Sequence, residues 1–530
     1  MNHSLPTLLE GDGLRTFGLP ILLVLVVTIY LRQSSLSRKE LKPLPGPKGL
    51  PLLGNLLQVP RTRAWLKFTE WREQYGDLIG LNVAGQDLIV IGNSKIAADL
   101  LDRRSAIYSD RPKNIVARLL TGDMVFAFSQ HNDLWRTMRR GSQEALGPQI
   151  TKKYCRMQEV EGLLLLGDVV KDPENWAAHL RRAAASLVIG VIYGVPPIRN
   201  YLEPDIVRVN LFVERALYAA APGSFLVEYF TWMQYLPRWM SPWRRYAEDS
   251  FNRDSSMFED LFAGVKKRLD AGDETPSVAA DVIRDNKSLG MSDRQAAWFS
   301  ATLYAAGAET TSGQVAWVIV AMILYPETMK KAQAEIDRVV GRGRLPNFSD
   351  YEHLPYIRAM VKEILRWRGV SPLAVPHRLC QDDVYDGYFI KKDTICVVNV
   401  WALNHDRDIY GVDAEDFNPD RHLDSNGKLK ASVPNTHDEN HHTFGFGRRI
   451  CVGRHLSKNS IFMQIASLLW AFDIKSGKDA NGIIVLPDAM NGINDGLVVR
   501  PPEFPCVMTP RFPEVPSLIA EAKELHGYTD

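Results

Sequence analysis

The segment Phe444-Gly-Phe-Gly-Arg-Arg-Ile-Cys-Val-Gly453 is the most informative stretch of this 530-residue chain. Its glycines allow the backbone to turn tightly and to approach a flat partner closely. Cys451 stands at this turn, directly before an apolar helical pattern, where a helix N-terminus and nearby cations favour a thiolate. A small buried cysteine in an ordinary turn is the competing interpretation, and the surrounding glycines and arginines weaken it.

Residues 292–325 predict a long helix in the core. The stretch begins with the capping-box pattern Ser292-x-x-Gln295 and is apolar nearly all round. Its middle, Ala306-Gly-Ala-Glu-Thr-Thr311, breaks this pattern, because a threonine hydroxyl competes for a backbone carbonyl and a water can insert. We therefore expect a polar notch in an apolar helix. A tolerated kink and a second membrane span are the alternatives, and the notch argues against the span.

The pair Glu363-x-x-Arg366 places an acid and a base on one helical face. Taken alone, this spacing indicates a surface ion pair. A buried network would need a third partner, because an unpaired buried charge is costly. Arg421, in the segment Phe417-Asn-Pro-Asp-Arg421, is the candidate.

Composition and charge limit the class of protein. The chain is 45% hydrophobic and 24% charged, which is typical of an ordered globular protein. Lys plus Arg number 63 against 62 for Asp plus Glu, so no global field favours nucleic acid. The five cysteines are scattered and form no close C-x-x-C pair, which argues against a zinc or dithiol site and favours a reduced, cytosol-facing body.

The first sixty residues predict a membrane anchor and a stiff connection. Residues 17–31 carry no charge, and Arg32, Arg38 and Lys39 follow them instead of a small-residue cleavage site. We expect residues 1–34 to form a luminal N-terminus and a single-pass anchor, with Asn2 in a glycosylation sequon. Residues 35–60, rich in proline, would be a hinge. A cleaved signal peptide is the alternative.

The rest of the chain predicts one large domain, residues 61–512, followed by a solvated tail, residues 513–530. No repeat or low-complexity linker divides it. Short strands are expected at residues 78–83, 88–91, 384–390 and 394–400, and helices nearly everywhere else. The fold class is mainly α with small β-sheets. The aromatic residues crowded into residues 225–246 indicate either ordinary core or a surface that dips into a membrane interface.

These segments, in this order and spacing, resemble the cytochrome P450 superfamily from the proline hinge to about Arg511. The heme-binding signature is matched by Phe444-x-x-Gly447-x-Arg449-x-Cys451-x-Gly453, the oxygen-activation motif by residues 306–311, the Glu-x-x-Arg motif by Glu363 and Arg366, the third-partner segment by Phe417-x-Pro419-x-Arg421, and the heme-contacting helix by Trp135-x-x-x-Arg139. The anchor and hinge resemble microsomal members, and the layout is most similar to fungal secondary-metabolism members.

The resemblance implies a cytochrome P450 fold that binds heme b. Cys451 would be the axial ligand of the heme iron, and its thiolate would favour O–O cleavage. Glu309 and Thr310 would be catalytic residues that deliver protons. The implied propionate-binding residues are Trp135, Arg139, His377 and Arg449, and the implied structural network is Glu363, Arg366 and Arg421. The implied substrate pocket comprises Phe299, Thr302, Leu303, Ala306, Ser371, Leu373, Val375, Leu497 and Val498, with residues 111–128.

The implied activity is that of a monooxygenase of the endoplasmic reticulum membrane, with a cytosolic catalytic domain, acting on an apolar terpenoid, polyketide or indole. Electrons would come from an NADPH-dependent reductase, with cytochrome b5 as a second donor. The docking patch would comprise Arg136, Arg140, Arg448, Arg454 and Lys458, and His441 and His442 would be a solvated lead-in to the signature. A heme-thiolate isomerase or reductase, and a heme protein without turnover, are the alternatives. The isomerase or reductase is disfavoured by the presence of Glu309, Thr310 and the anchor. The heme protein without turnover is disfavoured because it would have no use for a proton-delivery pair.

Overall fold

A computed structural model describes residues 42–200, 202–220, 224–494 and 498–528 of the protein. The predicted anchor, the Asn2 sequon and the first part of the predicted hinge lie outside these residues. From residue 42 on, the predicted hinge lies against the body: the Lys42 N–H donates to the Gly387 carbonyl at 3.0 Å, and the Asn55 N–H donates to the Asn82 carbonyl at 2.5 Å.

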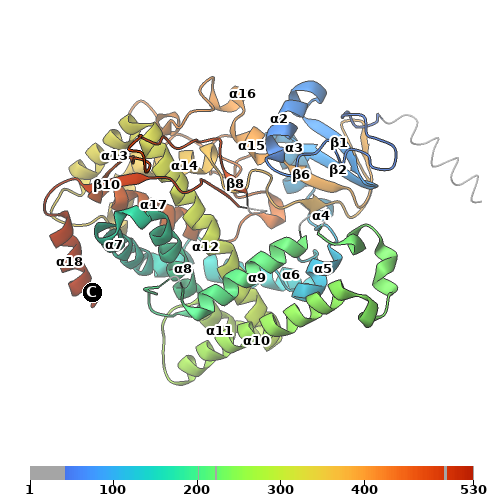
Figure 1. Cartoon of the computed structure of the whole chain (residues 1–530), viewed down its shortest axis with the longest axis horizontal. Coiled ribbons are helices and arrows are strands. Elements are labelled where there is room, and N and C mark those ends of the chain that lie inside the picture. The colour runs from blue at the N-terminus through green and yellow to red at the C-terminus, as the bar shows by residue number, and fades with distance from the viewer. Residues whose placement is uncertain (1–41, 201, 221–223, 495–497, 529–530) are drawn as a thin grey trace, which may run out of the picture.

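Helices dominate the described chain, as the sequence predicts (Figure 1). The α-helices are α2 (Ala64–Tyr75), α3 (Ser94–Ala97), α4 (Ser105–Tyr108), α5 (Ile115–Thr121), α6 (Asp133–Leu146), α7 (Cys155–Lys171), α8 (Trp176–Tyr193), α9 (Pro204–Ala220), α10 (Pro242–Asp270), α11 (Val278–Leu289), α12 (Asp293–Leu324), α13 (Pro326–Val339), α14 (Pro355–Trp367), α15 (Val400–Asn404), α16 (Arg407–Tyr410), α17 (Arg454–Ala471) and α18 (Val515–Leu525). A π-helix, η1 (Ala98–Arg103), joins α3 to α4. The 3-10 helices are η2 (Ile150–Tyr154), η3 (Pro173–Asn175), η4 (Leu226–Glu228), η5 (Thr231–Tyr235), η6 (Arg238–Met240), η7 (Phe348–His353), η8 (Pro419–His422) and η9 (Gly447–Arg449).

The strands form small sheets, and the four predicted strand regions are confirmed. They are β1 (Leu78–Val83), β2 (Gln86–Ile91), β3 (His377–Arg378), β4 (Asp383–Tyr385), β5 (Tyr388–Ile390), β6 (Ile395–Val398), β7 (Phe472–Ser476), β8 (Ile493–Asn494), β9 (Val499–Arg500) and β10 (Cys506–Pro510). The largest sheet has the order β1-β2-β6-β3, in which β2 and β6 run parallel and the other pairs antiparallel. This sheet places His377, in β3, beside the buried Cys396 of β6.

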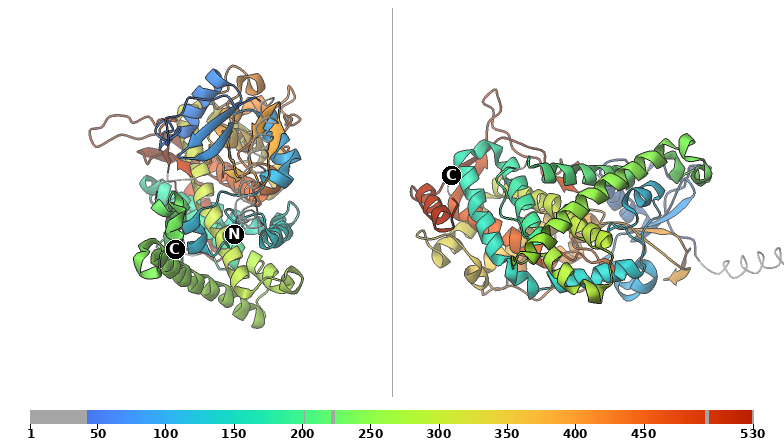
Figure 2. Two further views of the ribbon diagram at one scale, coloured as in Figure 1. Left: turned by 90° about the vertical axis from the view of Figure 1, so that its right-hand side faces the viewer. Right: turned by 90° about the horizontal axis from the view of Figure 1, so that it is seen from below.

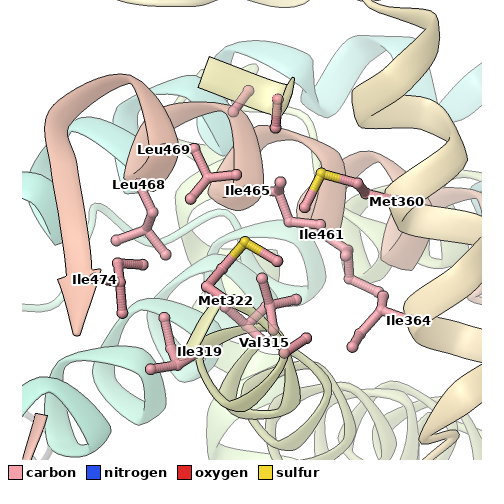
Figure 3. Close-up of a cluster of buried hydrophobic side chains, with 14 of the residues drawn as sticks. Val315, Ile319, Met322, Met360, Ile364, Ile461, Ile465, Leu468, Leu469 and Ile474 are labelled. Carbon is pink, nitrogen blue, oxygen red and sulfur yellow. The ribbon is translucent and has the colours of Figure 1, made fainter. Parts of the chain in front are cut away.

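Helix α12 is the central element of the core. Its capping box is formed as predicted: the Gln295 N–H donates to Ser292 Oγ, and the Ser292 N–H donates to the Gln295 side chain. One half of α12 packs into a cluster with α14, α17 and β7, drawn in Figure 3, and the other half packs into a second cluster with α8, α9 and α10. Both clusters share this helix, so α12 links the two parts of the core. Although α12 is long and apolar enough to cross a membrane, it is mostly buried inside the protein.

The C-terminal segment differs from the predicted solvated tail. Residues 515–525 form α18, which packs against α7. Val515 and Ile519 are buried in the same cluster as α17, at 0% and 2% exposure. Three turns of an amphipathic helix are enough to bury an apolar stripe, and this stripe packs against the core.

Candidate active site

The turn that carries Cys451 is closed by its own backbone. The Cys451 N–H donates to the Phe444 carbonyl at 2.8 Å, and α17 begins three residues later. Gly447 has a φ of 54°, and a Cβ there would come within 2.0 Å of the Leu101 carbonyl oxygen, so only glycine fits. Cys451 is solvent-accessible but closely surrounded by protein, which indicates that it faces an internal space. Desolvation raises the pKa of its thiol, while the Gly453 N–H and the charge of Arg454 lower it.

Helix α12 has the predicted notch. The Thr310 hydroxyl donates to the Ala306 carbonyl at 2.7 Å, one turn back along the helix. Ala306 is exposed although it lies in the middle of a core helix, between the buried Leu303 and Ala308. An exposed position there indicates an internal space beside α12. The next residue, Gly307, lies so close to Val188 of α8 that a Cβ there would come within 3.0 Å of its side chain.

A cationic cluster lies beside η9. The guanidinium of Arg449 stacks on the Trp135 ring at 4.2 Å and donates to the carbonyls of Ser109 and Ser129 at 2.8 and 2.7 Å. Arg111, which is 4% exposed, donates to the carbonyls of residues 375 and 376. Burial lowers the pKa of both arginines, to about 9 for Arg449, and the charge of Arg449 also lowers the pKa of Arg111. The cluster therefore holds two cations, the buried Arg111 and the partly buried Arg449.

Two further predicted residues adjoin this cluster. His377 is buried, and its Nδ1 lies 2.8 Å from the Tyr108 carbonyl. Burial and the charges of Arg111 and Arg449 hold its pKa well below the usual range. Arg139, on α6, donates to the Ile450 carbonyl at 2.6 Å, next to Cys451.

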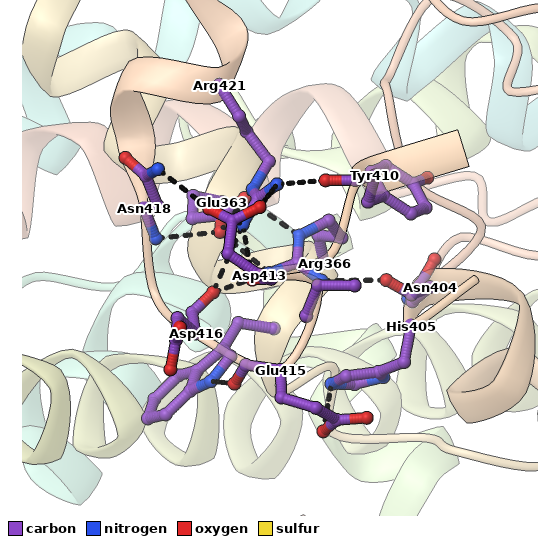
Figure 4. Close-up of polar contacts among 12 residues, drawn as sticks. Glu363, Arg366, Asn404, His405, Tyr410, Asp413, Glu415, Asp416, Asn418 and Arg421 are labelled. Carbon is purple, nitrogen blue, oxygen red and sulfur yellow. Dashed lines mark hydrogen bonds and ion pairs between the residues drawn. The ribbon is translucent and has the colours of Figure 1, made fainter. Parts of the chain in front are cut away.

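The predicted network around Glu363 is present and buried (Figure 4). Arg366 pairs with the Glu363 carboxylate through two hydrogen bonds of 2.7 and 2.8 Å, and both residues have 0% exposure. Arg421 donates to the same carboxylate at 3.0 Å, so the three-residue network is formed as predicted. His422 adds a contact at 2.8 Å that the sequence analysis missed. Although burial raises it, the pKa of Glu363 falls to about 2 because its cationic partners stabilise the carboxylate.

The expected solvated position of His441 and His442 was wrong. Both are buried, at 2% exposure, behind the Cys451 turn. His442 stacks on Phe446 with ring centroids 5.5 Å apart, and the His441 ring lies 5.2 Å from that of Phe444. Burial lowers the pKa of both, to about 4 for His442. Their rings pack on aromatic residues of the turn. The polar character of histidine does not predict this packing.

Comparison with known proteins agrees with this geometry. A family model for cytochrome P450 matches residues 44–497. The chain belongs to the cytochrome P450 family. It is 50% identical to a cytochrome P450 monooxygenase of Armillaria gallica over 96% of this chain and 97% of that protein. It is 42% identical to a cytochrome P450 monooxygenase of Postia placenta, over 95% and 96% of the two chains, and 36% identical to the monooxygenase iboC of Amanita muscaria, over 95% and 97%.

Membership in the cytochrome P450 family implies a heme-thiolate cofactor, and the residues present fit one. The indole Nε1 of Trp135 is buried and has no hydrogen-bond partner among the described residues. Arg111 and Arg449 lie beside it, and the nearby Asp110 is already paired with Arg378. An orphaned donor, a buried cation and a partly buried cation suit a dianionic group such as a pair of propionates. Arg111, predicted only as part of a substrate loop, is thus a further candidate for holding this group.

The residues expected to line the substrate pocket of the P450 fall into two groups. Ala306 is exposed, and Ser371, Leu373, Val375 and Val498 are partly buried. By contrast, Phe299, Thr302 and Leu303 are buried in the core at 0%, 6% and 7% exposure. Leu497 lies outside the described residues. The predicted loop 111–128 contains the helix α5.

The predicted docking patch is smaller than its five residues suggest. Arg136, Arg140 and Arg448 are exposed, although Arg136 pairs with Asp133 at 2.6 Å, and Arg454 is partly buried. Lys458 instead makes two contacts of 2.7 Å with the buried carboxylate of Glu439, which neutralises it.

Proposed function

We propose that this cytochrome P450 is a heme b monooxygenase that inserts one atom of dioxygen into an apolar small molecule. The observation that carries this proposal is the accessible Cys451 thiol inside the protein, together with the exposed Ala306 in the notch of α12. The bound heme would activate dioxygen, and its thiolate ligand would favour O–O cleavage.

The chain's own groups have distinct roles in this proposal. Cys451 would ligate the iron, and Trp135, Arg111 and Arg449 would hold the propionates by charge-assisted hydrogen bonds. Thr310 would pass a proton from its hydroxyl, whose position is fixed by the bond to Ala306. Glu309, one residue earlier, would exchange protons with it through water. Arg139 would steady the Cys451 turn through Ile450.

We propose a terpenoid, polyketide or indole as the substrate class, oxidised by hydroxylation in one or several steps in fungal secondary metabolism. Leu373, Val375 and Val498 support an apolar substrate, because pockets of this kind obtain most of their affinity from apolar contacts. The relatives named above are fungal monooxygenases, which supports a fungal metabolic role.

We further propose that an NADPH-dependent P450 reductase supplies the electrons, with cytochrome b5 as a second donor, at the endoplasmic reticulum membrane. Three exposed arginines, Arg136, Arg140 and Arg448, support an acidic partner. The segment 225–240 supports a membrane surface, because it exposes Trp232, Tyr235 and Trp239 at 60%, 90% and 75%. Figures 1 and 2 place this green segment at the end of the molecule where the described chain begins.

Spectroscopy and turnover together test the proposal. The reduced carbon-monoxide complex of the wild type should show the red-shifted Soret band of a thiolate ligand, and Cys451→Ala should lose it. With reductase, NADPH and dioxygen, candidate apolar substrates should gain one oxygen atom, traceable with labelled dioxygen, at a rate that falls with salt. A wild-type Soret band without the red shift would overturn the heme-thiolate assignment. Heme-replete protein that consumes no NADPH with any substrate would favour a protein without turnover.

A further inference from the structure

A strained backbone segment precedes the heme-binding turn. Asn435, His437, Asp438 and Asn440 all have φ between 50° and 65°, in the left-handed region that favours glycine. Such conformations persist only where the surrounding structure fixes them, and they gather at functional sites. The segment 435–440 is fixed on one side, because the Lys362 ammonium donates to the Asp438 carbonyl at 2.9 Å.

The other side of this segment is fixed by η1, a π-helix. Helices of this type are rare in proteins, and those that occur often lie at functional sites. Asp102, in its last turn, directs Oδ1 toward the heme-binding turn, where it accepts a short hydrogen bond from the Gly447 N–H. The same oxygen lies 3.1 Å from His437 Nε2. One carboxylate oxygen therefore joins η1, the strained segment and the turn.

The contact between η1 and the turn is close and permits little movement. The Leu101 carbonyl lies where a Cβ of Gly447 would be, and Phe446 is buried in a cluster with Leu100 and Leu101. His437 also lies against Phe446, with ring centroids 6.2 Å apart. A shift of Asp102 would therefore move Gly447.

We propose that Asp102 is a positioning residue that holds the heme-binding turn, and with it Cys451 and Arg449, through a clamp that is tightest when His437 is charged. This inference rests on the heme-thiolate assignment of Cys451. Asp102 would not touch the heme itself. It would act through Gly447, which begins the short helix η9 that ends at Arg449, two residues before Cys451.

The clamp should weaken as pH rises. The carboxylate of Asp102 raises the pKa of His437 above its ordinary value, burial and the charge of Arg454 lower it, and Glu439 adds a small raising effect. Other charged or titratable groups nearby are Asp438, Lys362, which donates to the Asp438 carbonyl, and Arg103, which donates to Asn435. Burial lowers the pKa of His442, also nearby, to about 4. A histidine whose pKa is raised on folding contributes stability that is complete below the unfolded pKa and is lost as pH rises through the folded pKa.

Four variants of the full-length heme protein separate the parts of the clamp. Asp102→Leu removes both the acceptor for Gly447 and the charge. Asp102→Asn keeps the acceptor and removes the charge. His437→Gln keeps a donor to Asp102 but cannot titrate. Asp99→Asn is the matched control, because Asp99 lies on the same π-helix and binds Lys95 and Arg103 instead of the turn.

The measurement is the rate at which the reduced carbon-monoxide complex loses its thiolate-type Soret band, followed across about pH 5 to 8. In the wild type and in Asp99→Asn, this rate should rise with pH through the titration of His437. The rise should be absent in His437→Gln and Asp102→Asn. Asp102→Leu should lose the band at least about tenfold faster at every pH, as expected for a lost hydrogen bond to a charged group. Circular dichroism melts separate this effect from general unfolding.

Two outcomes overturn this inference and leave the heme-thiolate assignment intact. In the first, Asp102→Leu loses the thiolate band no faster than Asp99→Asn does. In the second, the pH dependence of that rate survives in His437→Gln. A wild type without the thiolate band overturns the proposed function as well. Where Asp102→Leu fails to fold, the two charge-only variants still decide the question.

Discussion

At the scale of single residues, Thr310 marks the polar notch of the continuous core helix α12. Its hydroxyl donates to the Ala306 carbonyl, and such a bond loosens the helical ladder at that turn. This notch could be predicted from the sequence because both partners lie four residues apart. The accessible Cys451 was equally predictable, since its glycines and arginines are its neighbours in the chain.

We expect Thr310→Ala to separate NADPH consumption from product formation. Without the hydroxyl, fewer protons reach the bound oxygen, so hydrogen peroxide should rise as product falls. The loss of product should be roughly tenfold, below the about 10²-fold that a lone proton donor contributes, because Glu309 remains. Product, peroxide and NADPH are measured together. Ser312→Ala is the control, because Ser312 makes a similar bond, to the Glu309 carbonyl at 3.2 Å. Equal peroxide yields from the two variants would contradict the role of Thr310.

The position of Arg111 beside Arg449 and Trp135 could not be predicted from its neighbours in the sequence. Arg111 is separated by 264 positions from the carbonyl of Val375 that it binds, and by even more from Arg449. Only folding brings Arg111 and Arg449 together with the orphaned indole of Trp135. The residues next to Arg111 in the sequence indicate only a loop.

The Arg111→Leu variant should release heme faster. Removing one charge-assisted partner of the propionates should raise the rate of heme transfer to an excess of apomyoglobin by about tenfold or more. Arg118→Leu is the matched control, because Arg118 is an exposed residue of α5 that pairs only with Asp123 in the described structure. If both variants lose heme at the wild-type rate, Arg111 does not hold the cofactor.

At the scale of elements, the Glu363 carboxylate joins α14 to the segment that contains η8. Arg366 also donates to the carbonyls of Asn404, Ala414 and Asp416, so the network fixes a loop that has little regular structure. The spacing of Glu363 and Arg366 predicted one pair. The burial of this pair, and the added contacts from Asn418 and His422, depend on packing between elements.

We expect Glu363→Ala to leave buried cations without an anion, at a cost of about 3 to 5 kcal/mol. Heme content and the urea midpoint should both fall. Glu352→Gln is the control, because Glu352 pairs with Arg358 at a side-chain exposure of 72%, where such pairs contribute about 0 to 1 kcal/mol. The pKa of Glu363, about 2 in the folded protein, lies below its unfolded value. Its stabilisation should therefore persist at neutral pH and be lost only as pH falls toward about 2. A midpoint unchanged in Glu363→Ala would contradict the structural role.

At the scale of the whole molecule, the positions of helices and strands along the chain were predicted better than the contacts between them. Helix α12 and the strands follow local periodicity, so their bounds agree closely with the structure. Helix α18 and the buried His441 and His442 were missed, because their burial depends on surfaces contributed by α7 and by the heme-binding turn. Periodicity alone could not show which of the two interpretations of residues 225–246 holds, whereas the exposed aromatic side chains favour the surface.

The same exposed side chains allow a test of membrane contact in the full chain. Residues 1–41 contain no tryptophan, so an anchor there gives no tryptophan signal. In bilayer discs whose lipids carry brominated acyl chains, bromine quenches nearby tryptophan. We expect the double variant Trp232→Phe, Trp239→Phe to lose most of this quenching although ten of the twelve tryptophans remain, because these two amphipathic rings would lie at the interface. The matched control replaces Trp176 and Trp470, which are 3% and 0% exposed, and should keep the quenching. Equal quenching in the two double variants would show that segment 225–240 does not enter the bilayer.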